Sequence, residues 1–380
     1  MPDFGVHDAR QPPLQTLSFR SSAASLRPRA SLVLAFCMVL GVAGLLTGCA
    51  GPVQVDAPAV SETMAGGYEP ASSDDADDAD AAAVAAAQGE YFVRRSLPGA
   101  DGATTLQVLT RDARTAPLRY RVIVIPGSGC AGMGPIAERY FASLLHAQVL
   151  VLHKPGVDPQ ARTAPGDCAR DFVLHDRLSA WLAHARAALQ ADAQQRTREG
   201  APALPQLLVG ISEGAELLPA LAPEVPQLAG LVLLSASGLD PQEAGTLQAQ
   251  RLGAQADWDA LARRVASRQP DTVVAQGRSL GYWRDLWSWP LTLPLVRSPW
   301  PLLQVWGADD ALVPAAAYER FAVLAAVRTV PYCARSLAGA DHGLQRRTAD
   351  GAADGVQQVW AWTEQWARNP AAGLCAPLGR

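Results

Sequence analysis

The residue best placed to act as a nucleophile in this sequence is Ser212. It stands in a G-x-S-x-G pattern at 210–214, directly after an apolar run at 206–209 and at the start of a helical pattern at 214–222. On such a strand–turn–helix corner the serine lies at the tip of a sharp turn, and the flanking glycines let neighbouring backbone pass close to it. The alternative is that Ser212 only caps the following helix.

A serine hydroxyl becomes a strong nucleophile when a base takes its proton and an acid orients that base. Candidates for these two roles follow two later apolar runs. Asp309 and Asp310 come after the run at 301–306, and His342 comes after a weaker run at 329–337. Either aspartate could instead form a turn or cap the next helix, and a lone histidine is often only structural.

The elements that must position these side chains alternate along the chain. Short apolar runs at 121–125, 147–152, 206–209, 229–234, 301–306 and 329–337 alternate with helical patterns at 134–146, 169–192, 214–222, 314–327 and 355–368. This alternation predicts an α/β fold, with a mostly parallel sheet and helices on both faces. Active sites of such sheets form at the carboxyl ends of the strands, which is where all four candidates fall.

In chain order, Ser212, Asp310 and His342 resemble the triad of the α/β-hydrolase family, and the resemblance extends over roughly residues 100–370. The segment 307–314 is similar to the family's G-x-x-D-x-x-V-P loop, in which the second of the two aspartates matches the acid. The resemblance implies a serine hydrolase that cleaves an ester, thioester or related acyl bond through an acyl-enzyme. Peptidases and acyltransferases share the triad, and a non-catalytic envelope binding protein on the same scaffold is a further alternative.

The same resemblance implies an oxyanion hole with two backbone donors. One is the N–H of Glu213, directly after the nucleophile, and the other is the N–H of Ser128 or Gly129 in the glycine-rich loop 126–132. Pro126 stands where many relatives have histidine. A phosphate-binding loop is disfavoured because no Lys-Ser/Thr pair follows these glycines.

About 60 residues, from about 240 to 299, fit no strand of the predicted core, and in this family an insertion there forms a helical cap over the serine. Its helical pattern at 256–268 is followed by a cluster of aromatic residues. Four residues of this cluster are candidates for the lining of a substrate cleft: Tyr282, Trp283, Arg284 and Trp287. Arg284 could bind a carboxylate or phosphate. The alternative is that the aromatic residues pack the cap onto the domain.

Four cysteines fall within the predicted domain, and an even number in an exported domain favours two disulfides. They are Cys130, Cys168, Cys333 and Cys375. Three pairings are possible, of which chain proximity favours the first cysteine with the second and the third with the fourth; four buried free thiols are the alternative. No Cys-x-x-Cys or paired histidine indicates a metal, and no cofactor is expected.

The N-terminus carries the features of an export signal. The stretch 30–46 is almost entirely apolar and runs into Leu-Thr-Gly-Cys at 46–49, which resembles the lipobox of bacterial lipoproteins. The resemblance implies that residues 1–48 are a signal peptide and that Cys49 is the lipid-modified first residue of the mature protein. Ala50 rather than aspartate follows Cys49, and the resemblance to Gram-negative lipoproteins therefore implies sorting to the outer membrane, facing the periplasm. An uncleaved membrane helix is the alternative.

Residues 49–93 form an Ala/Asp-rich segment with nine acidic and no basic residues between positions 50 and 93, and we expect a disordered tether there. Residues 94–380 then form the hydrolase domain. The formal net charge is -4 without a basic run, which argues against a nucleic-acid partner. The expected partners are a small-molecule or lipid-like acyl substrate and, through the lipid anchor, a membrane.

Overall fold

The computed structural model describes residues 92–348 and 351–375, all of which belong to one compact unit. The predicted signal peptide at 1–48, the lipidation site Cys49 and nearly all of the predicted tether at 49–93 lie outside the described residues. Within the two described ranges, none of the helices combines the length and the apolar character that a membrane span requires.

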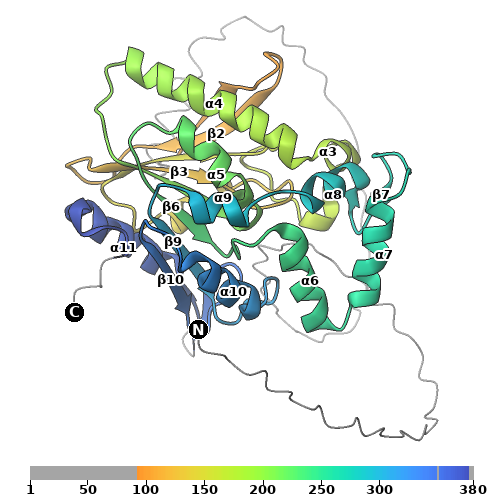
Figure 1. Cartoon of the computed structure of the whole chain (residues 1–380). Helices are drawn as coiled ribbons and strands as arrows, with labels where there is room; N and C mark the ends of the chain where they lie inside the picture. The colour runs from red at the N-terminus through yellow and green to blue at the C-terminus, as the bar shows by residue number, and fades with distance from the viewer. Residues whose placement is uncertain (1–91, 349–350, 376–380) are drawn as a thin grey trace, which may run out of the picture. The chain divides into compact units, whose positions relative to one another are not determined.

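The described residues build a central sheet of eight strands in the order β1-β2-β4-β3-β5-β6-β9-β10 (Figure 1). The strands are β1 (Val93–Pro98), β2 (Thr105–Arg111), β3 (Tyr120–Ile125), β4 (Ala147–Leu152), β5 (Gln206–Ile211), β6 (Leu228–Leu234), β9 (Leu302–Gly307) and β10 (Tyr332–Leu337). From β4 to β10 all neighbours are parallel, as predicted. β1 and β2 add an antiparallel edge.

Helices cover both faces of this sheet, so its strands are buried on both sides. Alternate side chains of each strand therefore enter two separate cores. In β3, Ile123 and Ile125 belong to one core, whereas Val122 and Val124 belong to the other. The first core is completed by α4 (Leu178–Arg198), α5 (Leu218–Leu221), α9 (Thr292–Arg297) and α10 (Ala315–Ala325). The second is completed by α2 (Gly134–Tyr140) and α11 (Val356–Arg368).

Several short elements connect these layers. They are η1 (Pro165–Asp167), α3 (Arg170–His175), η2 (Ser212–Leu217), η3 (Ala222–Glu224), the hairpin of β11 (Gln345–Thr348) and β12 (Gly351–Asp354), and η4 (Pro370–Ala372). The helix predicted at 169–192 is therefore two helices, separated at Asp176 and Arg177, which have extended backbone. The helix predicted at 134–146 ends at Tyr140.

The segment between β6 and β9 forms a helical insertion with a small core of its own. It contains α6 (Pro241–Leu252), α7 (Gln255–Val265), the two-residue strands β7 (Val274–Ala275) and β8 (Arg278–Ser279), and α8 (Leu280–Trp287). Its buried side chains include Trp258, Leu261, Leu280 and Trp283. In Figure 1, α6, α7 and the β7 segment lie together at the right of the sheet.

Two disulfides join the four cysteines in the pairing that chain proximity favours. Cys130–Cys168 ties the loop after β3 to the segment before α3, and Cys333–Cys375 ties β10 to the C-terminal segment. The alternative of free thiols is therefore wrong for this structure. The first bridge braces the glycine-rich loop that was predicted to contribute to the oxyanion hole.

Candidate active site

Ser212 follows the carboxyl end of β5 and is the first residue of η2, where its backbone has a strained φ of 52°. The two glycines of its pattern are required by close backbone approach. A Cβ at Gly214 would lie 2.2 Å from the carbonyl oxygen of Ile125, and one at Gly210 would lie 2.4 Å from the Cα of Ala215. The turn can therefore form only with these glycines, and it presents the serine at the edge of the sheet.

The structure brings the three predicted catalytic side chains into one chain of contacts. His342 Nε2 lies 3.1 Å from Ser212 Oγ, and its Nδ1 lies 2.8 Å from Asp310 Oδ2. Because an ionised carboxylate only accepts hydrogen bonds, Nδ1 carries the proton and Nε2 accepts from the serine hydroxyl. Asp309, the other aspartate considered, is exposed and has its backbone N–H bonded elsewhere.

Asp310 is held as an ionised acceptor by four donors. Its Oδ1 accepts from the backbone N–H groups of Leu312 and Val313, and its Oδ2 accepts from the Tyr318 hydroxyl as well as from His342. Burial by itself would raise the pKa of this carboxyl, but the hydrogen bonds and the charge of His342 lower the pKa below its ordinary value. The carboxylate is thus preorganised to orient the imidazole.

The glycine-rich loop after β3 runs against the nucleophile. A Cβ at Gly127 would lie 3.5 Å from the Cβ of Ser212, and Gly129 has a φ of 92°, a conformation that suits glycine. Ser128 borders both cavities that adjoin Ser212, whereas Gly129 borders the larger one. Glu213 follows Ser212 directly and borders the smaller cavity together with Ser128. That the backbone N–H groups of these residues bind an oxyanion stays a prediction.

Two cavities of unequal size meet at Ser212, with volumes of about 400 and about 70 Å³. The larger one is bordered by Gly129, Ile136, Tyr140, Arg162, His342 and Leu344. The smaller one lies under the insertion and is bordered by Glu216, Trp258, Trp283, Leu286, Leu312 and Val313. The nucleophile therefore has space on two sides.

Behind the nucleophile lies a buried charge network that sequence reasoning missed. Lys154, which follows β4, forms ion pairs with Asp176 at 2.9 Å and with Glu213. Arg278 of the insertion pairs with the same Asp176, and the Tyr282 hydroxyl donates to Glu213 at 2.6 Å. Burial would raise the pKa of Glu213, but the charges of Lys154 and Arg278 lower it below its ordinary value. Two positive and two negative charges thus balance inside the domain.

One signal for this network was present in the sequence. Lys154 is the single lysine among 32 basic residues, and it directly follows a buried strand. The compact ammonium group of a lysine differs in shape and hydrogen bonding from the guanidinium of the other basic residues. Its partners could not be identified without the fold, because Asp176 and Glu213 are distant in sequence.

The aromatic residues of the insertion divide between lining and support. Tyr282 and Trp283 border the smaller cavity, and that they contact a substrate stays a prediction. Trp287 instead stacks on Trp258 with ring centroids 4.5 Å apart, and Trp258 is the residue that borders the cavity. Sequence reasoning did not single out Trp258, because it precedes the aromatic cluster by more than twenty positions.

The prediction that Arg284 binds a substrate anion is corrected by the structure. Its guanidinium donates to the backbone carbonyls of Val265, Ser267 and Gln269 and pairs with Asp271. Nearly all of its donors are therefore used within the insertion. Arg284 joins α8 to the end of α7 and the loop that follows.

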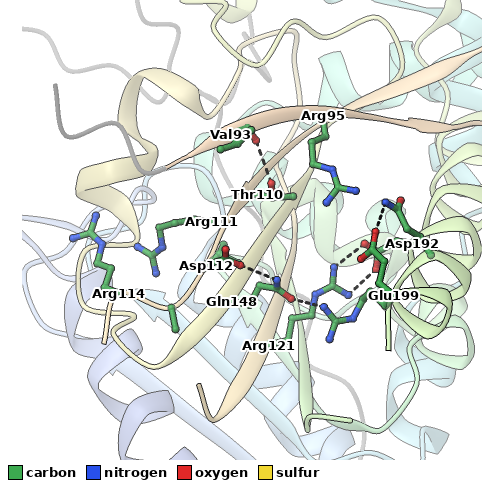
Figure 2. A pocket seen from close by; sticks show the side chains of 14 residues that line it. Val93, Arg95, Thr110, Arg111, Asp112, Arg114, Arg121, Gln148, Asp192 and Glu199 are labelled. Carbon is green, nitrogen blue, oxygen red and sulfur yellow. Dashed lines mark hydrogen bonds and ion pairs between the residues drawn. The ribbon is translucent and has the colours of Figure 1, made fainter. Parts of the chain in front are cut away.

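A further cavity of about 400 Å³ lies at the opposite edge of the sheet, beside the amino ends of β3 and β4 and the end of α4 (Figure 2). Five arginines and three acidic residues border it, so the recess carries more positive than negative charge. Arg121 pairs with Asp192 through two hydrogen bonds of 2.7 and 2.9 Å, and Arg196 donates to Gln148. None of the predicted catalytic residues borders it. It is a charged recess rather than a second arrangement of nucleophile and base.

No protein-family model matches the sequence, and no curated protein matches it either. Among solved structures, a mutant puromycin hydrolase complexed with PGG has a TM-score of 0.52 at 16% identity over 76% of this chain, and another puromycin hydrolase structure has 0.50 at 15% over 76%. The chain spans 40% of the length of each. Est1E from Butyrivibrio proteoclasticus has a TM-score of 0.49 at 17% identity, over 73% of this chain and 99% of its own.

Strand order, parallel pairing and the likeness to the two puromycin hydrolase structures together define the fold. The described domain has the α/β-hydrolase fold, with a mostly parallel sheet, helices on both faces and a helical insertion after β6. The predicted fold class is confirmed. At 15–16% identity the likeness concerns the fold, so the chemistry has to be argued from the site itself.

Proposed function

We propose that this protein is a serine hydrolase that cleaves an ester, thioester or related acyl bond. The observation that carries the proposal is the continuous contact chain from Ser212 through His342 to Asp310, with distances of 3.1 and 2.8 Å. A serine on a strained turn, a histidine within reach and an aspartate with four donors form the arrangement that activates a hydroxyl. The puromycin hydrolases that share the fold are consistent with it.

In the proposed reaction, His342 Nε2 takes the proton of Ser212 as Oγ attacks the carbonyl carbon of the substrate. Asp310 keeps the imidazole in the required tautomer and stabilises the imidazolium. The backbone N–H of Glu213 and that of Ser128 or Gly129 bind the oxyanion, each contributing about 3–4 kcal/mol. His342 then protonates the leaving group, and water releases the acyl group from Ser212 by the same steps in reverse.

A fluorophosphonate probe tests this proposal, because it labels only an activated serine. The protein should be labelled, Ser212→Ala should abolish labelling and turnover of acyl esters, and His342→Ala should abolish both as well. A control variant at the opposite edge of the sheet, Glu199→Gln, should behave as the parent. A folded protein that is not labelled would favour the non-catalytic binding protein instead. Turnover of matched ester and amide substrates would separate an esterase from a peptidase.

We also propose that the hydrolase is exported and anchored to a membrane by lipid on Cys49, facing the periplasm from the outer membrane. The support is the apolar stretch at 30–46 with Leu-Thr-Gly-Cys at 46–49. Two disulfides in the domain fit an oxidising compartment. Cys49→Ala should release the protein from membranes; a variant that stays membrane-bound would favour an uncleaved helix.

A further inference from the structure

If the proposed function holds, the two cavities at Ser212 receive opposite halves of the substrate. The general acid has to reach the atom that leaves, so the leaving group lies on the side of His342. His342 borders the larger cavity, together with Gly343 and Leu344. The acyl group then occupies the smaller cavity, under the insertion.

The smaller cavity is mostly apolar, and none of the described residues that border it is basic. Trp258, Trp283 and Leu286 form much of its wall. Two of its polar side chains, Glu213 and Tyr282, are already bonded to each other at 2.6 Å. A cavity of about 70 Å³ with such walls suits a short acyl chain better than a long one.

Glu216 differs from Glu213 and Tyr282 because one of its carboxyl oxygens has no hydrogen-bond partner within the described part of the chain. It borders the cavity, its side chain is only partly exposed, and its Oε2 is buried without a hydrogen-bond partner. Its backbone is fixed, because its carbonyl accepts from the indole of Trp289 at 2.9 Å. Buried polar atoms are nearly always paired, so an unpaired carboxyl oxygen beside a nucleophile calls for a ligand that completes it.

The surroundings favour the uncharged form of this carboxyl. Burial raises the pKa of Glu216 well above its ordinary value, and the charges of Glu213 and Asp240 raise it further. Glu213 is already paired with Lys154, and Asp240 accepts from the backbone N–H groups of the α9 start. A neutral carboxyl in an apolar cavity can donate as well as accept a hydrogen bond, which suits an uncharged polar group.

We propose that Glu216 is a specificity residue whose carboxyl hydrogen-bonds to an uncharged polar substituent, such as a hydroxyl, on a short acyl chain bound in the smaller cavity. A site that offers a hydrogen bond to a substrate hydroxyl discriminates against the analogue that lacks it far more strongly than an apolar pocket discriminates by size. The acyl group selected would therefore be a short hydroxyacyl group rather than a plain fatty acyl group.

The experiment measures kcat/KM of the full chain for esters of one chromogenic alcohol at about pH 7. The acyl groups are butanoyl, 2-hydroxybutanoyl, 3-hydroxybutanoyl, 3-aminobutanoyl and dodecanoyl, with Ser212→Ala protein as the blank. We expect one hydroxy ester to exceed butanoyl by about tenfold or more, and butanoyl to exceed dodecanoyl. Equal rates for the hydroxy and plain esters would overturn the role of Glu216, and so would a preference for the amine.

Two variants test Glu216 directly through one quantity, the ratio of kcat/KM for the hydroxy ester to kcat/KM for the plain ester. Glu216→Gln keeps a donor and an acceptor and should retain the preference, whereas Glu216→Leu should reduce the ratio to about one. Glu199→Gln serves as the unrelated control. If a variant does not fold, the ratios of the parent protein still decide. Labelling of Ser212 with a flat ratio rejects only this inference, while absence of labelling and turnover rejects the proposed function and the inference with it.

Discussion

Two glutamates on the single turn η2 have opposite surroundings, since one is paired with charged and polar side chains and the other borders an apolar cavity. Glu213 faces the network of Lys154 and Tyr282, and Glu216 faces the apolar cavity three positions further along. The pKa of Glu213 lies below its ordinary value, and the pKa of Glu216 lies well above it. Burial raises the pKa of both carboxyls, so burial alone does not explain why their pKa values shift in opposite directions. The partners decide the direction.

The charge network around Glu213, called the paired region here, also connects the α/β core to the insertion. Lys154 and Asp176 come from the α/β core, whereas Arg278 and Tyr282 come from the insertion. Lys154 and Tyr282 contact Glu213 directly, and Arg278 is connected to it through Asp176 and Lys154. The backbone N–H of Glu213 is a donor in the proposed mechanism. Glu216 is linked to the segment after α8 only through its backbone carbonyl, which accepts from Trp289, and its Oε2 has no hydrogen-bond partner among the described residues. We infer that the first carboxyl fixes the geometry of the turn, while the second is left for the substrate.

Lys154→Met breaks the paired region and should have the largest effect. Removal of the ammonium leaves Glu213 and Asp176 as buried charges with Arg278 alone, and such losses cost about 3–5 kcal/mol. Urea unfolding at neutral pH measures the change. Arg94→Met is the matched control, since its pair with Asp158 is half exposed and should cost less than about 1 kcal/mol. Equal effects of the two substitutions would contradict a special role for the network.

The sequence was sufficient for the fold class and for the residues that follow strands. Parallel strands are buried on both faces, so β3, β5, β6 and β9 were visible as apolar runs, and the side chains after them could be assigned to one edge. β1 was not visible, because five of the six side chains in Val93–Pro98 are exposed and no apolar run marks it. It begins at Val93, the last residue assigned to the tether.

What the sequence could not reveal are contacts between segments that only the fold brings together. Arg284 was assigned to the substrate because a positive charge stood among aromatic residues, yet Asp271 and nearby carbonyls take up its donors. Glu213 was considered only for its backbone N–H, and Glu216 was not considered at all. A side chain's charge state depends on neighbours from other elements, and spacing along one helix does not contain that information.

Glu213→Gln sharpens the paired side of the comparison and should have an intermediate effect. Loss of the charged hydrogen bond from Lys154 should cost about 2 kcal/mol at neutral pH. Because the folded-state pKa of Glu213 is lowered, its contribution is present above the unfolded pKa and is lost as the pH falls through the folded value. The stability gap between parent and variant, measured by urea unfolding, should therefore shrink on acidification below about pH 4.5. A gap that is independent of pH would argue against the ion pair.

Glu216→Gln tests the carboxyl without a hydrogen-bond partner and should have the smallest effect on stability. The stability difference between parent and variant should change with pH in the opposite direction to that of Glu213→Gln. The folded-state pKa of Glu216 is raised, so the parent protein is most stable, relative to the variant, below the unfolded pKa, and it loses stability as the pH rises toward the folded value. The glutamine variant does not titrate, so it should gain on the parent by about 1 kcal/mol between about pH 5 and about pH 6. Urea unfolding at both pH values measures this gain. If the variant instead lost stability relative to the parent over the same interval, Glu216 would be ionised and paired, and the two carboxyls of η2 would not differ in the way their surroundings indicate.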